Sequence, residues 1–204
     1  MTTNFDNTIR YSANITAGSL LLRESRKVTE LLLQGLSNHE IKQVVVEQNL
    51  FQVRSQSSST RRCRLILDRL NSLDNHILPM IVGNDLNLVI QALLACSIKH
   101  SRLLGDFMLR FVGQKIRLID DRITDRDWDK YIESCEDIDD HVKQFTESTK
   151  NKLRQVIMRI LIEAKFLESQ KTRRITPVRV EDELKSFLIN HDEKYVLRCL
   201  EVCE

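Results

Sequence analysis

Apolar side chains recur along most of this chain at the spacing of an α-helix. The clearest stripe consists of Cys63, Ile66, Leu67, Leu70 and Leu73, at positions i, i+3, i+4, i+7 and i+10. Residues at this spacing fall on one face, so the pattern predicts a helix that buries that face. Similar stripes predict helices over 18–36, 37–49, 86–98, 104–119 and 148–167, with one or two closing helices over 181–203.

Polar residues able to cap a helix N-terminus stand before several of these stripes. In a capping box, two polar side chains three positions apart each satisfy a free backbone N–H of the other residue. The chain has this spacing twice, and single capping residues precede three further stripes. The predicted caps are Ser37 with Glu40, Thr124 with Asp127, a serine within 52–59, Asp85, and either Ser148 or Thr149.

Turn-forming residues are scarce, with five glycines and two prolines in 204 residues. A sheet-rich chain needs more of them, so the sequence predicts an all-α, multi-helix globular bundle. The basic, β-branched segment 171–180 is the exception and predicts a short β-hairpin. With the basic helix before it, this segment indicates a winged-helix-like C-terminal part, although the apolar stripe of that helix equally suits a structural role. A change in charge and periodicity near residue 120 predicts two domains, 1–120 and 121–204.

Charge is distributed unevenly, although the net formal charge is only +2. The segment 120–140 holds ten acidic and three basic residues, whereas 148–180 holds nine basic and two acidic ones. Two shorter segments, 54–69 and 99–117, each carry five basic residues and one acidic residue. Local basic fields of this kind are typical of nucleic-acid-binding proteins, and solvated helix faces are the plainer alternative.

Motifs for catalysis, metals or cofactors are missing from the sequence. It has no Gly-rich phosphate loop, and its five histidines are scattered. Cys199 and Cys203 could share a helix face, but a zinc site needs further ligands that do not accompany them. The five cysteines are odd in number and widely spaced, which predicts reduced thiols and a cytoplasmic location. No apolar run reaches the length of a membrane span. We therefore expect a protein that is not an enzyme, with no cofactor, no metal and no membrane partner.

Two stretches resemble a known family. They are Thr16-Ala-Gly-Ser-Leu-Leu-Leu-Arg-Glu-Ser-Arg-Lys-Val-Thr-Glu-Leu-Leu-Leu-Gln-Gly35 and Asn49-Leu-Phe-Gln-Val-Arg-Ser-Gln-Ser-Ser-Ser-Thr-Arg-Arg62, the latter followed by the helix to Leu73. Together they are similar to the BrxA family, small components of the BREX bacteriophage-exclusion systems. The resemblance is most specific over residues 11–73.

This resemblance implies an all-helical bundle like that of antitermination factors, with that fold in residues 1–120. It also implies a non-catalytic role in bacterial antiviral defence, beside the other BREX components, which include a methyltransferase, an ATPase and a phosphatase-like protein. Members of the family resemble double-stranded DNA binders, so the expected partner is duplex DNA. The resemblance supplies no map of DNA contacts.

Candidate DNA contacts therefore follow from the placement of charge alone. We predict largely sequence-independent binding to phosphates, because such contacts position a protein without identifying bases. Reversing the charges of Arg61 and Arg62 is predicted to weaken binding by roughly tenfold. The candidates are Arg54, Arg61, Arg62, Arg64, Lys150, Lys152, Arg154, Arg173 and Arg174, with Arg23, Arg26 and Lys27 as possible additions unless Glu24 and Glu30 pair with them.

The alternative is a protein–protein adaptor without direct DNA contact, in which the acidic 120–140 segment docks a basic partner. RNA binding has less support, because aromatic residues make up 5% of the chain and form no cluster for base stacking. The sequence leaves four points open: the DNA sequence preference, the oligomeric state, the direct protein partner, and the step of phage exclusion or host methylation that the protein serves.

Overall fold

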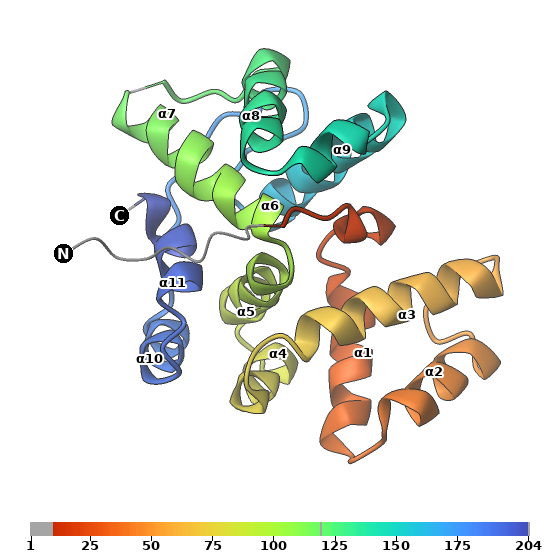
Figure 1. Cartoon of the computed structure of the whole chain (residues 1–204). Helices are drawn as coiled ribbons and strands as arrows, with labels where there is room; N and C mark the ends of the chain where they lie inside the picture. Colours follow the sequence, from red (N-terminus) through yellow and green to blue (C-terminus); the bar gives the residue numbers. More distant parts are fainter. Residues whose placement is uncertain (1–9, 119, 204) are drawn as a thin grey trace.

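Helices make up most of the structure, a computed structural model in which residues 10–118 and 120–203 are described (Figure 1). The all-α prediction is confirmed, since β contacts among these residues are limited to two isolated bridges. No helix in the same ranges is long and apolar enough to cross a membrane. The longer helices are α1 (Leu22–Leu33), α2 (Asn38–Glu47), α3 (Gln56–Leu70), α5 (Leu86–His100), α8 (Asp125–Ile138), α9 (Glu147–Glu163) and α10 (Asp182–Asn190).

Capping side chains and one glycine set several ends of the first three of these helices. Ser37 and Glu40 form the predicted capping box at α2, and Ser55 accepts a hydrogen bond from the backbone N–H of Ser58 at the start of α3. Gly35 follows α1 with a φ of +86°, a left-handed conformation that glycine adopts without a steric penalty. The short helix η1 (Asn14–Ala17) precedes α1 and lies against α3 and α9.

Helix α5 is the centre of the molecule. Asp85 caps it as predicted, and every side chain from Leu88 to Ile98 is buried. It contacts α1, α3, α10, the short helix α4 (Leu78–Val82) and the short helix α6 (Arg102–Asp106). Because neighbours surround it, α5 is apolar on all sides instead of along one stripe.

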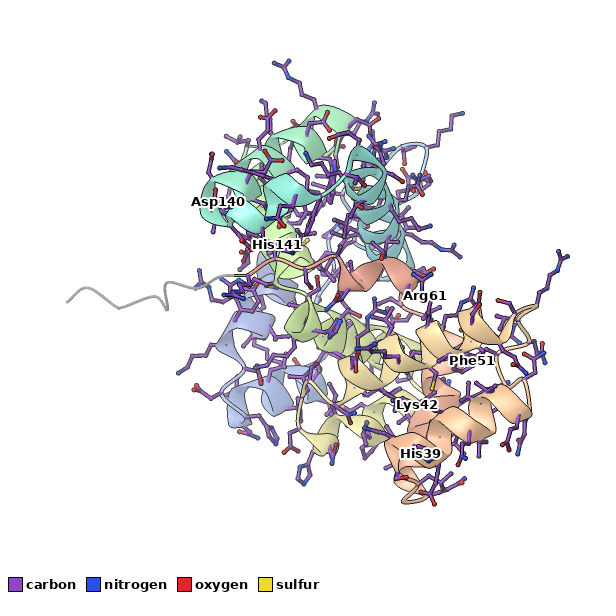
Figure 2. The ribbon with its side chains drawn as sticks, turned by 45° about the vertical axis from the view of Figure 1, so that its right-hand side comes forward. His39, Lys42, Phe51, Arg61, Asp140 and His141 are labelled. Atoms are coloured by element: carbon purple, nitrogen blue, oxygen red, sulfur yellow. The ribbon has the colours of Figure 1, made fainter. Side chains whose placement is uncertain are left out.

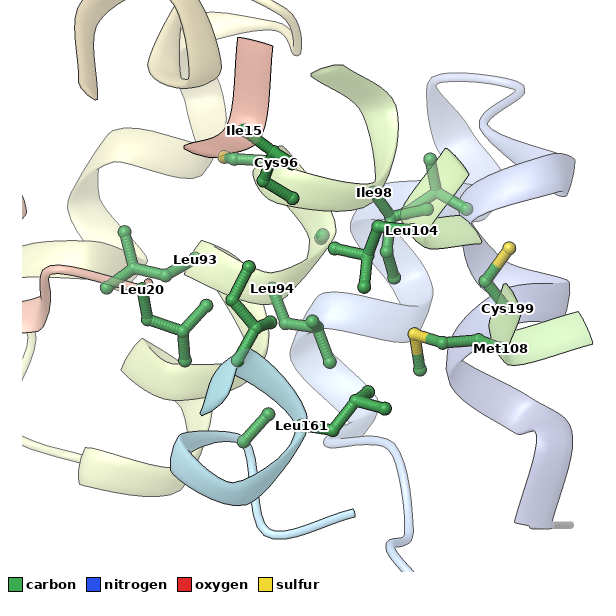
Figure 3. Packing of buried hydrophobic residues seen from close by; sticks show 14 of the residues in the cluster. Ile15, Leu20, Leu93, Leu94, Cys96, Ile98, Leu104, Met108, Leu161 and Cys199 are labelled. Atoms are coloured by element: carbon green, nitrogen blue, oxygen red, sulfur yellow. The ribbon is translucent and has the colours of Figure 1, made fainter. Parts of the chain in front are cut away.

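The buried side chains form one cluster that runs from Tyr11 to Leu200, near both ends of the described residues (Figure 3). Tyr11 and Ile15, which precede α1, are each 1% exposed. Leu161 and Cys199, from beyond residue 120, pack in the same cluster as Leu94 of α5. The division into the domains 1–120 and 121–204 stays a prediction.

The predicted helix over 104–119 is a run of three helical segments. A π-helix, η3 (Phe107–Val112), separates α6 from α7 (Gly113–Arg117). Its wider turns stack Phe107 on Phe111, with ring centroids 6.0 Å apart, and both rings contact Tyr131 of α8. Ile119, the predicted end of the helix, lies outside the described residues.

The C-terminal helices follow the predicted order with one corrected boundary. Thr124 and Asp127 form the expected capping box at α8, and Trp128 is buried as its anchor. The cap of α9 is Thr146, whose hydroxyl accepts from the backbone N–H of Thr149, so the prediction of Ser148 or Thr149 was wrong. The short helix η4 (Asp140–Gln144) lies between α8 and α9. Helices α11 (Lys194–Leu200) and η5 (Glu201–Cys203) follow α10.

The segment 171–180 does not support the predicted β-hairpin. Its two bridges join Arg174 to Arg122 and Ile175 to Leu167, so each partner lies on a different neighbouring segment. The segment therefore does not fold back on itself, and Pro177 lacks the N–H needed to extend a ladder. Helix α9 buries Leu153, Ile157 and Leu161 in the core, which fits the structural alternative better than a recognition helix with a wing.

Candidate nucleic-acid interface

Helix α3 presents its predicted arginines to solvent because its apolar stripe faces the core. We call Arg54, Arg61, Arg62 and Arg64 the α3 surface. Arg54 and Arg61 are exposed and form no ion pair with any residue of the described ranges. Arg64 contacts Asp68 at 3.8 Å, Nε to Oδ2, and its side chain is 78% exposed. An exposed pair at this distance contributes little, so three of the four guanidinium groups are available to an anion.

Arg62 is placed differently from its neighbours. Its Nη1 lies 3.3 Å from Glu24 Oε1 of α1, and the arginine is half-buried between the two helices. The sequence left open a pairing of Glu24 with the basic residues of its own helix, and the structure shows Glu24 in contact with α3. Arg62 therefore helps to hold α1 against α3.

A shallow hollow of ≈ 350 Å³ lies between α3 and η1. Arg61 and Arg64 line it on one side, and Asn14 and Thr16 line it on the other. Figure 2 shows Arg61 next to η1, with His39 and Lys42 on the neighbouring helix α2. Lys42 is exposed and belongs to no ion pair among the described residues, and the sequence analysis did not select it.

The possible additional contacts on α1 are mostly occupied by backbone carbonyls. Arg26 donates to the carbonyl oxygens of Val82 and Gly83 at 2.9 and 3.0 Å. Lys27 donates to the carbonyl of Leu50 at 2.8 Å. These two side chains satisfy orphan carbonyls near the ends of α4 and α2, so their roles are structural.

Arg69 lies on the inner side of α3, 4% exposed. Its guanidinium donates to the carbonyls of Ser19 and, at 3.2 Å, Gly18, and Glu163 of α9 accepts from the Ser19 hydroxyl at 2.8 Å. Burial lowers the pKa of Arg69 to about 10. The two carbonyls and the nearby carboxylate of Glu163 stabilise the positive charge of Arg69. This network anchors the chain before α1.

Two of the three predicted basic residues of α9, Lys150 and Arg154, lie against the acidic stretch. Lys150 Nζ is 2.9 Å from Glu136 Oε1 on α8 and 3.2 Å from Glu147 Oε1. The hydrogen bond to Glu136 is the main reason why the pKa of Lys150 is raised. Lys152 is exposed, and within the described ranges it has no ion-pair partner.

Asp125, the first residue of α8, joins α9 to the segment 171–180. It accepts from Arg154 Nη1 at 3.1 Å and from Arg173. The hydrogen bond from Arg173 lowers the pKa of Asp125, and the charges of both arginines act in the same direction against partial burial. Arg174 Nε lies 2.9 Å from Asp121 Oδ2.

The acidic and basic stretches therefore neutralise one another. We call the set Asp121, Asp125, Glu136, Lys150, Arg154, Arg173 and Arg174 the α8–α9 surface. Lys115 of α7 adds to this neutralisation, with its Nζ 2.6 Å from Asp120 and 3.0 Å from Asp127. Four of the five predicted C-terminal contacts are thus paired, and the α3 surface is the more available of the two.

Sequence reasoning missed a second basic surface, formed by residues distant in the chain. Arg110 of η3, Arg117 of α7 and Arg198 of α11 line one hollow of ≈ 1230 Å³. The basic segment 99–117 was a signal for the first two, but nothing local connects them to Arg198. We call this hollow the basic groove.

Side chains able to bind a metal gather at one place in the described ranges. Asp74, His76 and His191 offer ligand atoms within 4.8 Å of one another. Asp74 Oδ1 is engaged by the backbone N–H of His76 at 2.9 Å and by its ring at 2.5 Å, as the cap of the short helix η2 (Asn75–Ile77). Cys199 and Cys203 donate to separate carbonyls, those of Gly105 and Thr176, and burial raises the pKa of the Cys199 thiol to about 12.

Comparison with known proteins gives a consistent result over nearly the whole chain. The family model BrxA matches residues 9–192. A protein named "BREX protein BrxA" from Paramagnetospirillum magneticum is 35% identical over 95% of this chain and 97% of its own length. A Bacillus cereus protein of the same name is 30% identical over 93% of this chain and 91% of its own length. The crystal structure of an uncharacterized protein from Magnetospirillum magneticum superposes with a TM-score of 0.86 at 35% identity, covering 95% of this chain and 100% of that one.

Proposed function

This chain belongs to the BrxA family of BREX components, and from that premise we propose that it binds double-stranded DNA through the α3 surface as a non-catalytic accessory protein. The supporting observation is a set of exposed arginines without a strong acidic partner among the described residues, namely Arg61 and Arg64 on α3 and Arg54 just before it. Such groups can neutralise phosphates and release counterions, which is the main source of sequence-independent affinity.

The geometry of α3 suits a phosphate backbone. Arg61 and Arg64 lie about one turn apart on α3, ~4.5 Å along the helix axis, and Arg54 lies two residues before the helix begins at Gln56. One DNA strand carries a phosphate about every 3.4 Å of duplex axis, so Arg61 and Arg64 can meet neighbouring phosphates of one strand. The first turn of α3 contains no acidic residue that would repel them.

The proposal can be tested by titrating the protein into a labelled random-sequence duplex at two salt concentrations, with single-stranded RNA as comparison. We expect duplex binding that weakens steeply with salt. The double variant Arg54→Glu with Arg61→Glu is expected to lower affinity by roughly tenfold or more. This variant is a better test than reversing Arg61 and Arg62 together, because reversing Arg62 would also break its contact with Glu24.

A charge-matched control is Lys130→Glu with Lys171→Glu. Both lysines are exposed, and neither forms an ion pair with a described residue. This variant changes the net charge equally but leaves the α3 surface intact, so its affinity is expected to fall far less. Equal losses in the two variants, or no duplex binding at low salt, would contradict the proposal.

An adaptor role is the second candidate. The sequence suggested it because the acidic segment 120–140 could dock a basic partner. Ion pairs within the α8–α9 surface now occupy several of those acids, which weakens this argument. The observation that favours it is the basic groove, which combines positive charge with exposed apolar side chains.

A further inference from the structure

The basic groove is lined by five cationic side chains and a single acidic one. The run from α6 to α7 and helix α11 supply these charged side chains, and helix α8 adds Ser134 and Ile138 to the lining. The acid is Asp106, and it is already paired with Arg102 at 3.0 Å, Nε to Oδ1. The lining cations are Arg102, Arg110, Arg117, Lys194 and Arg198.

Most of this positive charge has no internal counterpart. Arg110, Arg117 and Arg198 are exposed and form no ion pair within the part of the chain that the structure describes. Lys194 contacts Asp192 at 2.7 Å, but both side chains are about four-fifths exposed (82% and 79%), so solvent screens this pair. Like charges held around one hollow raise the local affinity for anions.

The groove also exposes apolar side chains, which sets it apart from the α3 surface. Leu118 and Ile138 line it and are 67% and 40% exposed. Leu109 and Phe111 of η3 line it as well. Exposed apolar groups rimmed by polar ones mark a site that a partner covers.

Buried contacts hold the walls of the groove in place. Asp106 accepts hydrogen bonds from the hydroxyls of Tyr11, at 2.8 Å, and Tyr195, at 2.9 Å. The guanidinium carbon of Arg102 lies 3.9 Å from the centroid of the Tyr195 ring. Tyr195 can approach this closely because Gly105 has no side chain, since a Cβ there would overlap the tyrosine hydroxyl. These contacts fix α11 against α6, so the groove exists before any partner binds.

The π-helix η3 contributes three successive lining residues, Leu109, Arg110 and Phe111. Single π-turns inside helices are often found at functional sites. The rings of Phe111 and Tyr131 also meet edge to face, with centroids 5.2 Å apart, which secures this turn against α8.

We propose that the basic groove docks an acidic, amphipathic segment of a partner protein. Carboxylates of that segment pair with Arg110, Arg117 and Arg198, and its apolar side chains cover Leu118 and Ile138. This is the helix-in-groove mode of recognition, with apolar anchors along one face and charges that set orientation. Duplex DNA fits less well, because a phosphate backbone has nothing apolar with which to cover the two aliphatic side chains. The proposal does not rest on DNA binding by the α3 surface.

The test uses the full chain and a labelled peptide of four Glu-Glu-Leu-Leu repeats, measured by fluorescence anisotropy. We expect binding with a Kd on the order of 10 µM. Reversing two groove charges, Arg110→Glu with Arg198→Glu, is expected to weaken it at least about tenfold. Replacing the apolar pair, Leu118→Ser with Ile138→Ser, is expected to weaken it by roughly three- to tenfold. All four side chains are exposed, so both variants should fold, as circular dichroism can verify.

Matched probes and variants separate the possible outcomes. A peptide of Lys-Lys-Leu-Leu repeats and one of Glu-Glu-Ser-Ser repeats are expected to bind at least about tenfold more weakly, because each lacks one of the two required features. The variant Arg54→Glu with Arg61→Glu should keep full peptide affinity. No binding of the acidic peptide, or binding insensitive to Arg110 and Arg198, overturns the proposal. A third result also overturns it: Arg110→Glu with Arg198→Glu abolishes duplex DNA binding but leaves the affinity for the acidic peptide unchanged. The groove would then be a nucleic-acid surface.

Discussion

The α3 surface and the α8–α9 surface carry similar numbers of basic residues but differ in what folds against them. On α3, Arg54 and Arg61 have no acidic partner among the described residues. At α8–α9, Asp125 alone engages Arg154 and Arg173, and Glu136 engages Lys150. The density of arginine and lysine along a sequence therefore does not determine the local potential. The acids that tertiary structure brings beside them decide whether those charges are available to a ligand.

The largest expected effect concerns the inner side of α3, where an arginine is structural. Arg69→Ala removes the donors to the carbonyls of Gly18 and Ser19 and leaves a cavity. We expect a loss of roughly 3 kcal/mol in the free energy of unfolding, measured by urea denaturation. Arg61→Ala, on the exposed side, should change it by no more than about 0.5 kcal/mol. Similar values for the two variants would show that the faces of α3 do not differ as described.

A smaller effect, on duplex DNA affinity, is expected when the basic residues of the α8–α9 surface are freed from their acidic partners. Asp121→Asn with Asp125→Asn removes the acidic partners of Arg154, Arg173 and Arg174. If charge availability limits DNA binding, duplex affinity at low salt should rise several-fold. The dependence of log K on log salt should steepen by up to about 0.9 per freed cation.

The control for this variant is Asp182→Asn, because the one ion pair of Asp182 with a described residue is that with the exposed Arg179, at 3.4 Å. It should leave the salt dependence close to that of the unmodified protein. An unchanged salt dependence in the double variant would mean that the freed arginines do not reach DNA, and that pairing is not what separates the two surfaces.

The smallest expected effect is the acid dependence of the α8–α9 surface. The hydrogen bond from Arg173 lowers the pKa of Asp125 in the folded protein below the value of about 3.9 expected for an unfolded chain. Its stabilisation is therefore complete above that value and is lost as pH falls through the lower, folded-state pKa. Since the Asp125 side chain is 57% exposed, we expect at most about 1 kcal/mol.

Urea denaturation at pH 5 and pH 3 measures this contribution as the difference between the protein and Asp125→Asn. The variant should be the less stable of the two at pH 5, and the gap should narrow at pH 3. A gap that widens on acidification would contradict the assignment of Asp125 as an ionised partner of Arg154 and Arg173.

Helix positions and most caps were predictable from the sequence because they depend on short-range chemistry. Ser37, Asp85 and Thr124 cap their helices through hydrogen bonds to backbone N–H groups no more than three residues away. The cap of α9 was misplaced because Thr146, Ser148 and Thr149 all have suitable side chains within one turn. The π-turn of η3 had no local signal, since its apolar spacing fits an ordinary helix equally well.

The candidate site was predictable only in part. The α3 surface follows from one helix and its apolar stripe, so its outward face could be identified from spacing alone. The pairing of Arg173 and Arg174 with Asp125 and Asp121 could not, because the partners are about fifty residues apart along the chain. The basic groove joins Arg110 to Arg198 across a still longer interval.

The sequence by itself determined that this chain is helical, where most helices begin, which faces they bury and which family it resembles. These properties come from periodicity and from hydrogen bonds between residues a few positions apart. Tertiary structure alone decided which charges are free, that 171–180 pairs with two different neighbours instead of forming a hairpin, and that a basic groove exists. Coulombic attraction and burial act on distance in space, and that distance is set only when distant segments pack together.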